Sequence, residues 1–178
     1  MSSQISFLDV AYAGTANKEQ TLDIYLPTQT LDTRAPMLIV FLHGGAWRSG
    51  DKSEWTHFGE FFPRHGFAFA IPNYRLSHIE DGELMLKHPE HLMDCAKAVE
   101  FCWKNGEEYG FDATRIILSG HSAGGQLSGL LVLQPKWLED LGGKELYDCI
   151  RYGYFISDCA RGFVVLTLRI KSQRLRWD

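Results

Sequence analysis

Length, composition and charge place the chain among ordinary globular proteins. It has 178 residues, of which 45% are apolar and 22% charged, and these values predict one folded domain rather than a disordered chain. The formal net charge of -4, without a basic stripe interleaved with aromatic residues, argues against nucleic acid as a partner. No apolar run approaches the roughly 20 residues that a membrane helix requires, so no membrane partner is expected. The sequence leaves the oligomeric state open.

The amino-terminal segment lacks the features of a secretory signal. No lysine or arginine precedes its short apolar run, and Asp9 interrupts that run. The four cysteines, Cys95, Cys102, Cys149 and Cys159, show no CxxC spacing and are expected to be reduced structural thiols. A cytoplasmic location is the resulting expectation.

Apolar strands alternate with amphipathic helices along the first part of the chain. Thr21–Leu26 alternates apolar with polar residues and is expected to form a half-buried, outer antiparallel strand. The uninterrupted apolar runs Met37–Leu42 and 67–71 are typical of parallel strands that are covered on both faces. Helical spacing of apolar residues marks segments 54–65 and 89–108.

A further apolar run leads into the most distinctive motif of the chain. Residues 115–118 continue directly into SGHSAGG and then into a small-residue helix that is expected to end near Leu133. Segments 154–157 and 162–168 are expected to be additional strands, the second followed by a basic tail. This alternation predicts an α/β protein with a doubly wound, mostly parallel sheet.

The segment GHSAG fits the pattern G-x-S-x-G and makes Ser122 the candidate nucleophile. In this pattern a strained turn between a strand and a helix lifts the serine hydroxyl out of the sheet, and small flanking residues permit the sharp fold. The alternative is a purely structural serine whose hydroxyl caps the amino terminus of the helix. The apolar strand before the motif and the helix after it favour the nucleophile.

A second glycine motif, HGGAW, follows the predicted strand Met37–Leu42. Backbone amides at glycines can approach a developing oxyanion closely and form an oxyanion hole. The expected donors of this oxyanion hole are Gly44 or Gly45 together with Ala123. Trp47, directly after these glycines, is a candidate for the wall of a substrate pocket, and packing against the core is the equally weighted alternative.

Together, HGGAW and GHSAGG, with YRL and HPEHLMD between them, resemble the HGG-type carboxylesterase and arylformamidase branch of the α/β-hydrolases. Kynurenine formamidase is one member class to which the sequence is similar. The resemblance covers roughly residues 5–160 and implies an α/β-hydrolase fold without a cofactor, in which Ser122 attacks a small ester or aryl formamide. It does not decide between the two substrate classes.

The sequence departs from the pattern of this branch after the nucleophile. The resemblance implies an acid and then a histidine beyond Ser122, but all seven histidines precede it. Asp158 is the nearest acid and a weak candidate. Residues 1–178 are therefore expected to form a single, incomplete α/β-hydrolase domain that lacks the last strands, with an atypical basic tail at 161–178. Impaired turnover is expected, and a noncatalytic binding protein or truncated isoform is the alternative.

Two further side-chain patterns have structural interpretations. His88, His91 and Asp94 have the spacing of one helix face, but without an HExxH pattern or second cluster they are expected to be partly exposed residues of a first helical turn, and no metal is expected. A structural pair between Asp94 and Arg75 is considered. His43 is expected to hydrogen-bond and shape its own loop, as is His121.

Overall fold

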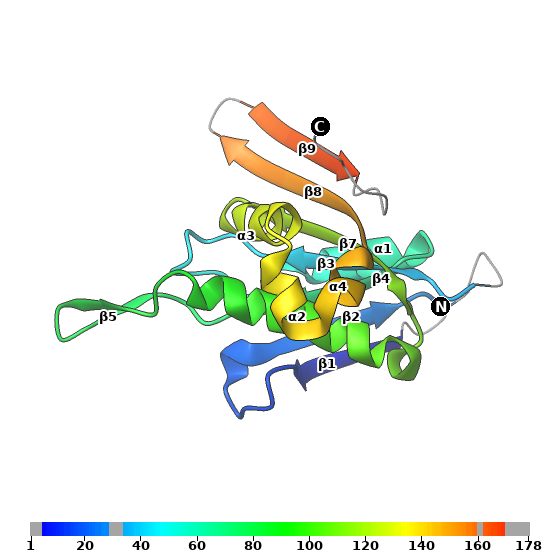
Figure 1. The fold of residues 1–178 in the computed structure, drawn as a ribbon, viewed down its shortest axis with the longest axis horizontal. Coiled ribbons are helices and arrows are strands. Elements are labelled where there is room, and N and C mark those ends of the chain that lie inside the picture. Colours follow the sequence, from blue (N-terminus) through cyan, green and yellow to red (C-terminus); the bar gives the residue numbers. More distant parts are fainter. Residues whose placement is uncertain (1–4, 29–33, 160–161, 170–178) are drawn as a thin grey trace.

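A seven-stranded sheet forms the centre of the protein (Figure 1). The structure, a computed structural model, describes residues 5–28, 34–159 and 162–169. The strands lie in the order β1-β2-β4-β3-β7-β8-β9, and their bounds are β1 Ile5–Ala11, β2 Thr21–Leu26, β3 Met37–Leu42, β4 Ala68–Pro72, β7 Asp112–His121, β8 Ile150–Cys159 and β9 Gly162–Arg169. The α-helices are α1 Thr56–Arg64, α2 Glu90–Tyr109, α3 Ala123–Leu133 and α4 Lys136–Asp148, and the 3-10 helices are η1 Lys18–Gln20 and η2 Lys52–Trp55.

The middle of the sheet is parallel, as predicted. Strand β3 pairs in parallel with β4 on one side and with β7 on the other, and β7 pairs in parallel with β8. The chain therefore adds β4 on one side of β3 and then crosses to add β7 on the other. In open α/β sheets a ligand crevice forms where the strand order reverses in this way, at the carboxyl ends of the strands. The topology thus directs attention to the loops after β3 and β7.

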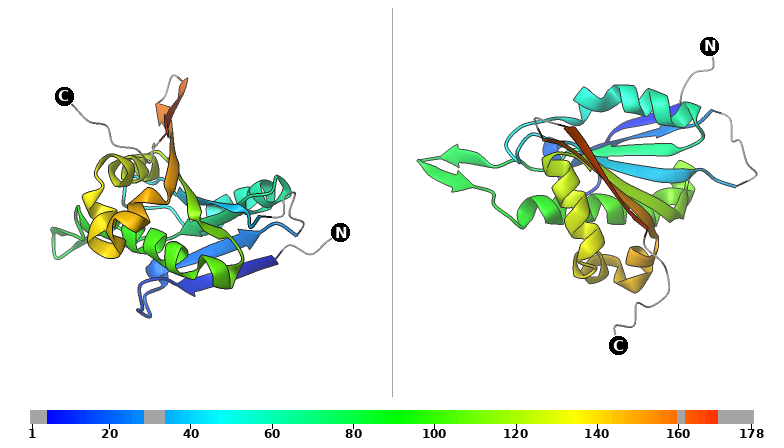
Figure 2. Two further views of the ribbon diagram at one scale, coloured as in Figure 1. Left: turned by 45° about the vertical axis from the view of Figure 1, so that its right-hand side comes forward. Right: turned by 90° about the horizontal axis from the view of Figure 1, so that it is seen from above.

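Helices cover both faces of the central strands, with α1 on one face and α2, α3 and α4 on the other (Figure 2). An apolar layer lies beneath the helices on each face. In β3 the alternate residues Leu38 and Val40 face the layer built with α2, α3 and α4, whereas Ile39 and Phe41 face the aromatic layer built with α1. Successive side chains of a strand point to opposite faces. An uninterrupted apolar run is therefore what a strand with both faces covered requires, which confirms the interpretation of Met37–Leu42.

Strand β2 is antiparallel, as predicted, but it is neither outer nor half-buried. Strand β1 pairs with its outer edge, and the side chains from Leu22 to Leu26 are all buried. The polar residue Asp23 does not face solvent as the alternating pattern predicts. Its carboxylate is buried because it accepts hydrogen bonds from the buried Lys52 ammonium and from the Asp9 backbone N–H. A buried carboxylate with a cation and an amide as partners does not need water.

The hairpin of β5 (His78–Glu80) and β6 (Glu83–Met85) extends away from the body of the protein (Figures 1 and 2). No strand was predicted there. Its turn consists of Asp81 at φ 49° and Gly82 at φ 79°, two successive residues with positive φ. Asp-Gly is a common pair in tight hairpin turns of this kind, so a local signal was present.

The other predicted helices, β4 and β9 lie close to their expected bounds, whereas β7 and β8 are longer than the predicted strands at 115–118 and 154–157. Strand β1, the 3-10 helix η1 and helix α4 are additional. Most of the predicted basic tail, from residue 170 onward, lies outside the described residues. Within the described part of the chain, no helix combines the length and apolar character needed to cross a membrane.

Candidate active site

The two glycine motifs meet at the carboxyl ends of neighbouring strands. Leu42, the last residue of β3, pairs with Gly120 near the end of β7, so the loops that follow both strands begin side by side. The HGGAW segment follows β3 directly at this end of the sheet, and Ser122 lies in the turn from β7 into α3. The sheet register therefore joins two motifs that are far apart in the sequence.

Ser122 lies in a strained turn and is exposed to solvent. Its φ of 52° and ψ of -116° are unusual for a residue with a side chain, and the residue is exposed. It stands at the N-cap position of α3, yet its side chain makes no capping hydrogen bond. The alternative of a serine that caps the helix through its hydroxyl is therefore wrong.

Glycines on either side of Ser122 make the turn possible. A Cβ added to Gly120 would lie 2.4 Å from the carbonyl carbon of Gly124, and a Cβ added to Gly124 would lie 2.0 Å from the carbonyl oxygen of Leu42. Such distances are far inside van der Waals contact. The amino terminus of α3 thus packs directly on the backbone at the end of β3, which no larger residue permits.

The HGGAW loop is held against this turn. A Cβ on Gly44 would lie 2.7 Å from Nδ1 of His121 and 3.2 Å from Cβ of Ser122. Gly45 has a φ of +119°, and its carbonyl oxygen accepts hydrogen bonds of 3.0 Å from the backbone N–H groups of both Arg48 and Ser49. Glycine alone adopts this backbone conformation readily. The loop therefore places backbone amides close to the Ser122 turn.

His43 shapes the same loop, as expected. Its imidazole is fully buried, lies 2.8 Å through Nδ1 from the carbonyl oxygen of Gly44 and stacks on Tyr74 with ring centroids 4.3 Å apart. The Tyr74 hydroxyl in turn donates to the carbonyl oxygen of His43 over 2.8 Å. Burial lowers the pKa of His43, so the ring is neutral and its Nδ1–H donates to Gly44. Within the described residues its Nε2 atom finds no partner.

The free energy of unfolding should fall as the pH drops below 6.5, the ordinary pKa of histidine. Burial lowers the pKa of both His43 and His91 in the folded protein, so the unfolded chain takes up protons first and is favoured by acid. Over each pH unit in which only the unfolded histidine is protonated, one such residue removes about 1.4 kcal/mol. Urea titrations at pH 7.5, 6.5 and 5.5 measure this slope. His43→Asn should reduce this slope, and an unchanged slope in His43→Asn would contradict the assignment.

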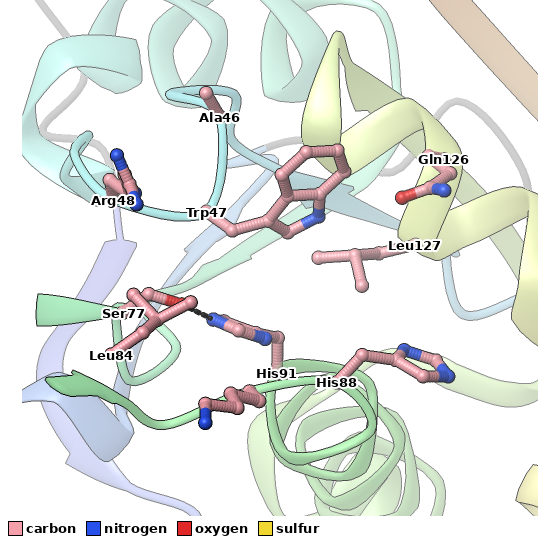
Figure 3. Close-up of a pocket in the computed structure, with 10 residues that line it drawn as sticks. Ala46, Trp47, Arg48, Ser77, Leu84, His88, His91, Gln126 and Leu127 are labelled. Carbon is pink, nitrogen blue, oxygen red and sulfur yellow. Dashed lines mark hydrogen bonds between the residues drawn. The ribbon is translucent and has the colours of Figure 1, made fainter.

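A pocket of about 320 Å³ lies beside the two motifs (Figure 3). Ala46 and Trp47 of the HGGAW loop line it, together with Gln126 and Leu127 from the first turns of α3. Ser122 is one helical turn before Gln126, whose backbone N–H donates to the Ser122 carbonyl over 3.1 Å. The pocket therefore adjoins the Ser122 turn. Trp47 lines it and also packs against the apolar core, so both alternatives for this residue hold.

The opposite side of the pocket is formed by residues that the sequence did not indicate as site residues. His91 of α2 is buried, and its Nε2 lies 3.0 Å from the Ser77 hydroxyl, which itself donates to the carbonyl oxygen of Leu86 over 2.6 Å. The backbone N–H of Ser77 donates to the Trp47 carbonyl over 2.8 Å. These bonds fix the start and end of the hairpin segment against the HGGAW loop.

The pair of Asp94 and Arg75 that the sequence suggested is present, and the expected partial exposure is wrong for His91 and Asp94, which are buried, whereas His88 is exposed and precedes α2. Asp94 is fully buried and accepts from Nε and Nη2 of Arg75 at 2.7 and 2.9 Å and from Nε2 of Gln20 at 2.8 Å. His91 points instead to Ser77. No group of three or more metal-binding side chains occurs among the described residues. Burial of one helix face against the sheet explains why these polar residues are inside.

Asp158 lies within a strand rather than after one. Strand β8 continues through Ser157 and Asp158 to Cys159, and Asp158 pairs with Phe163 of β9. The strand predicted at 154–157 therefore extends through Asp158.

The parallel sheet, the strained serine turn and the adjacent glycine loop together define an α/β-hydrolase fold. A model of the BD-FAE family matches residues 22–144, which is more than half of the chain. The protein therefore belongs to the BD-FAE family.

Similar proteins are named as hydrolases. A kynurenine formamidase-like hydrolase of Fusarium equiseti is 35% identical over 136 residues, which cover 64% of this chain and 44% of that protein. A probable carboxylic ester hydrolase of Mycobacterium tuberculosis, LipM, is 33% identical over 130 residues, or 72% of this chain and 28% of that protein. Among solved structures, esterase B from Lactobacillus rhamnosis aligns with a TM-score of 0.66 and 26% identity, over 80% of this chain and 45% of that one. The chain thus spans about half the length, or less, of these relatives.

Proposed function

We propose that the protein is a serine hydrolase that cleaves small carboxylic esters or aryl formamides through an acyl-Ser122 intermediate. The observation that carries this proposal is the exposed, strained Ser122 turn packed against the HGGAW loop. The names of the relatives, a kynurenine formamidase-like hydrolase and a probable carboxylic ester hydrolase, support the reaction class.

Each residue of the turn has a proposed role. The Ser122 oxygen attacks the substrate carbonyl carbon, and the carbonyl electron pair moves onto oxygen. Backbone N–H groups of Gly44 or Gly45 and of Ala123 receive this oxyanion. The amides of the first helical turn have no partner within the helix, so the N–H of Ala123, the first residue of α3, suits this role. A preorganised donor of this kind lowers the barrier by roughly 3 kcal/mol. Collapse of this intermediate expels the alcohol or amine, which takes up the serine proton, and water then hydrolyses the acyl-Ser122 ester to release the acid.

Turnover by the 178-residue chain is proposed to be low. No histidine follows Ser122 in this sequence, whereas serine hydrolases use a histidine to accept the serine proton. Loss of that base lowers turnover by orders of magnitude but leaves the contributions of the oxyanion hole and of substrate binding. Slow acyl transfer is what these remaining groups support. The chemistry needs no cofactor.

A second candidate function is noncatalytic. The absence of a histidine after Ser122 favours a pseudo-hydrolase, or a shortened isoform, that binds ligands or partners through the same pocket. In this case the strained turn would be an inherited shape without a chemical role.

Hydrolysis of two matched substrates separates the candidates. Release of product from phenyl acetate and from formanilide is measured for the native protein and for Ser122→Ala. The hydrolase proposal expects slow release from at least one substrate that falls at least about tenfold in Ser122→Ala. Equal rates for the two proteins, with both shown to be folded, would support the noncatalytic candidate.

A further inference from the structure

Asn73, the first residue after β4, is hydrogen-bonded to the far end of the loop that begins with HGGAW. Its Nδ2 donates to Oδ2 of Asp51, and its Oδ1 accepts from the backbone N–H of Lys52, each over 2.7 Å. One side-chain amide thus holds two successive residues of the loop. Asn73 does not line the pocket, so any effect that it has on the reaction acts through the loop.

Gly50 connects this end of the loop with the proposed oxyanion hole. Its φ is +102°, and a Cβ added there would lie 2.4 Å from the carbonyl oxygen of Gly44 and 2.5 Å from Nδ1 of His43. The carbonyl of Gly44 belongs to the same rigid peptide group as the backbone N–H of Gly45, one of the proposed oxyanion donors. A shift of the backbone at residue 50 would therefore also shift that donor.

The segment that carries Asn73 is itself held in place from several sides. The backbone N–H of Asn73 donates to the carbonyl oxygen of Thr21 in β2, and its carbonyl oxygen accepts from the Tyr12 hydroxyl, each over 2.9 Å. Two residues later, Arg75 pairs with the fully buried Asp94 of α2. The Asn73 side chain therefore has a fixed position from which to hold the loop.

The bond between Asn73 and Asp51 joins one amide to one carboxylate. Burial acts to raise the pKa of Asp51, but hydrogen bonds from Ser53 and Asn73 outweigh it and lower this pKa, so the carboxylate is ionised near pH 7. Its other oxygen, Oδ1, accepts from the backbone N–H of Ser53 over 2.8 Å. Two carboxylates in these places would repel each other, and two amides would bring donor against donor. The pair therefore works only with one side chain of each kind.

We infer that Asn73 is a positioning residue of the proposed oxyanion hole and acts on it through the backbone of residues 50–52. The inference rests on the proposed hydrolase function and names a group that holds its oxyanion donors in place. The bonds from Asn73 fix residues 50–52, and these fix the peptide between Gly44 and Gly45. Preorganised donors stabilise a developing charge because they do not have to reorient during the reaction. Loss of the Asn73 bonds should therefore slow the chemical step and leave binding intact.

An exchange of the two side chains tests the inference. Asn73→Asp sets two carboxylates against each other, Asp51→Asn sets two amides against each other, and the double variant restores one of each. Asparagine and aspartate are nearly isosteric, and either can accept from the backbone N–H of Ser53. The control is Asn105→Asp, the same change at a half-buried residue of α2 whose Nδ2 donates to the carbonyl oxygen of Phe101 over 2.7 Å. Urea denaturation verifies that each variant is folded.

Two readouts distinguish positioning from general stability. The first is labelling of Ser122 by a fluorophosphonate, with the rate constant of the covalent step and the dissociation constant of the reversible complex measured separately. The second is the backbone amide signals of Gly44 and Gly45 in heteronuclear NMR spectra. Each single variant should shift these signals and lower the rate constant at least about tenfold at an unchanged dissociation constant, because loss of one oxyanion donor lowers rates by roughly 10²–10³. The double variant should restore both readouts, and Asn105→Asp should change neither.

Three results would each overturn the inference. They are glycine signals that stay in place in the single variants, a rate constant that stays unchanged although the signals shift, and a double variant no better than the worse single variant. If the native protein acquires no adduct, the hydrolase proposal fails instead. The glycine signals alone then decide whether Asn73 positions the loop, so the two proposals fail separately.

Discussion

Gly124→Ala should lower the free energy of unfolding by about 3 kcal/mol or more. The added Cβ would lie 2.0 Å from the carbonyl oxygen of Leu42 and 2.4 Å from that of His43. Both are backbone atoms at the end of a central strand, so α3 must move away from the sheet to relieve the clash. Alanine is otherwise the better helix former by roughly 1 kcal/mol, so any loss of stability reports the contact and not helix propensity.

Gly82→Ala is the control for this substitution. Gly82 lies in the hairpin turn with a φ of +79°, and a Cβ added there would have no heavy atom within 4 Å. Only the left-handed conformation opposes this change, at a cost of about 1–2 kcal/mol. Chemical denaturation of the two variants gives both values. A Gly124→Ala protein as stable as the parent would show that α3 does not pack on β3 as described.

Removal of the Asp94 carboxylate should cost about 3–5 kcal/mol of stability. The group is fully buried and holds Arg75 through two nitrogens and Gln20 through one. Asp94→Ala would leave these donors without their acceptor, and an unpaired buried donor or charge is far more costly than the loss of a well-solvated pair.

The matched control is Glu100→Ala, which removes one partner of the helix-surface pair with Lys104. Exposed pairs of this kind contribute less than about 1 kcal/mol. Urea denaturation at pH 7 compares the two variants with the parent. Similar small losses for both would contradict the structural role of the buried carboxylate.

The sequence predicts the central sheet well because local patterns there coincide with tertiary packing. Met37–Leu42 is apolar throughout, and both of its faces are in fact covered. Strand β2 has an alternating pattern that predicts one solvent-exposed face. Asp23 on that face is buried because the Lys52 ammonium, far along the chain, neutralises it. A local pattern of apolar and polar residues contains no information about a partner so distant in the sequence.

The candidate site shows the same division between local and distant information. The Ser122 turn and the Gly44 loop carry glycines that backbone geometry demands, so motifs reveal them. The pocket wall made by His91 and Ser77 depends on how a hairpin returns to the start of α2. No spacing rule encodes that contact, although the Asp-Gly pair at residues 81–82 could have indicated the hairpin itself.

The most direct test of the hydrolase proposal is labelling of the purified protein with a fluorophosphonate probe, followed by mass mapping of the adduct. Such probes react with activated serine hydroxyls. The proposal predicts an adduct on Ser122 that forms slowly, because no histidine follows Ser122 to accept its proton, that disappears in Ser122→Ala and that persists in Ser77→Ala, which removes the hydroxyl that lines the pocket. A protein that is shown to be folded but acquires no adduct at Ser122 would contradict the proposal and leave the site as a binding pocket only.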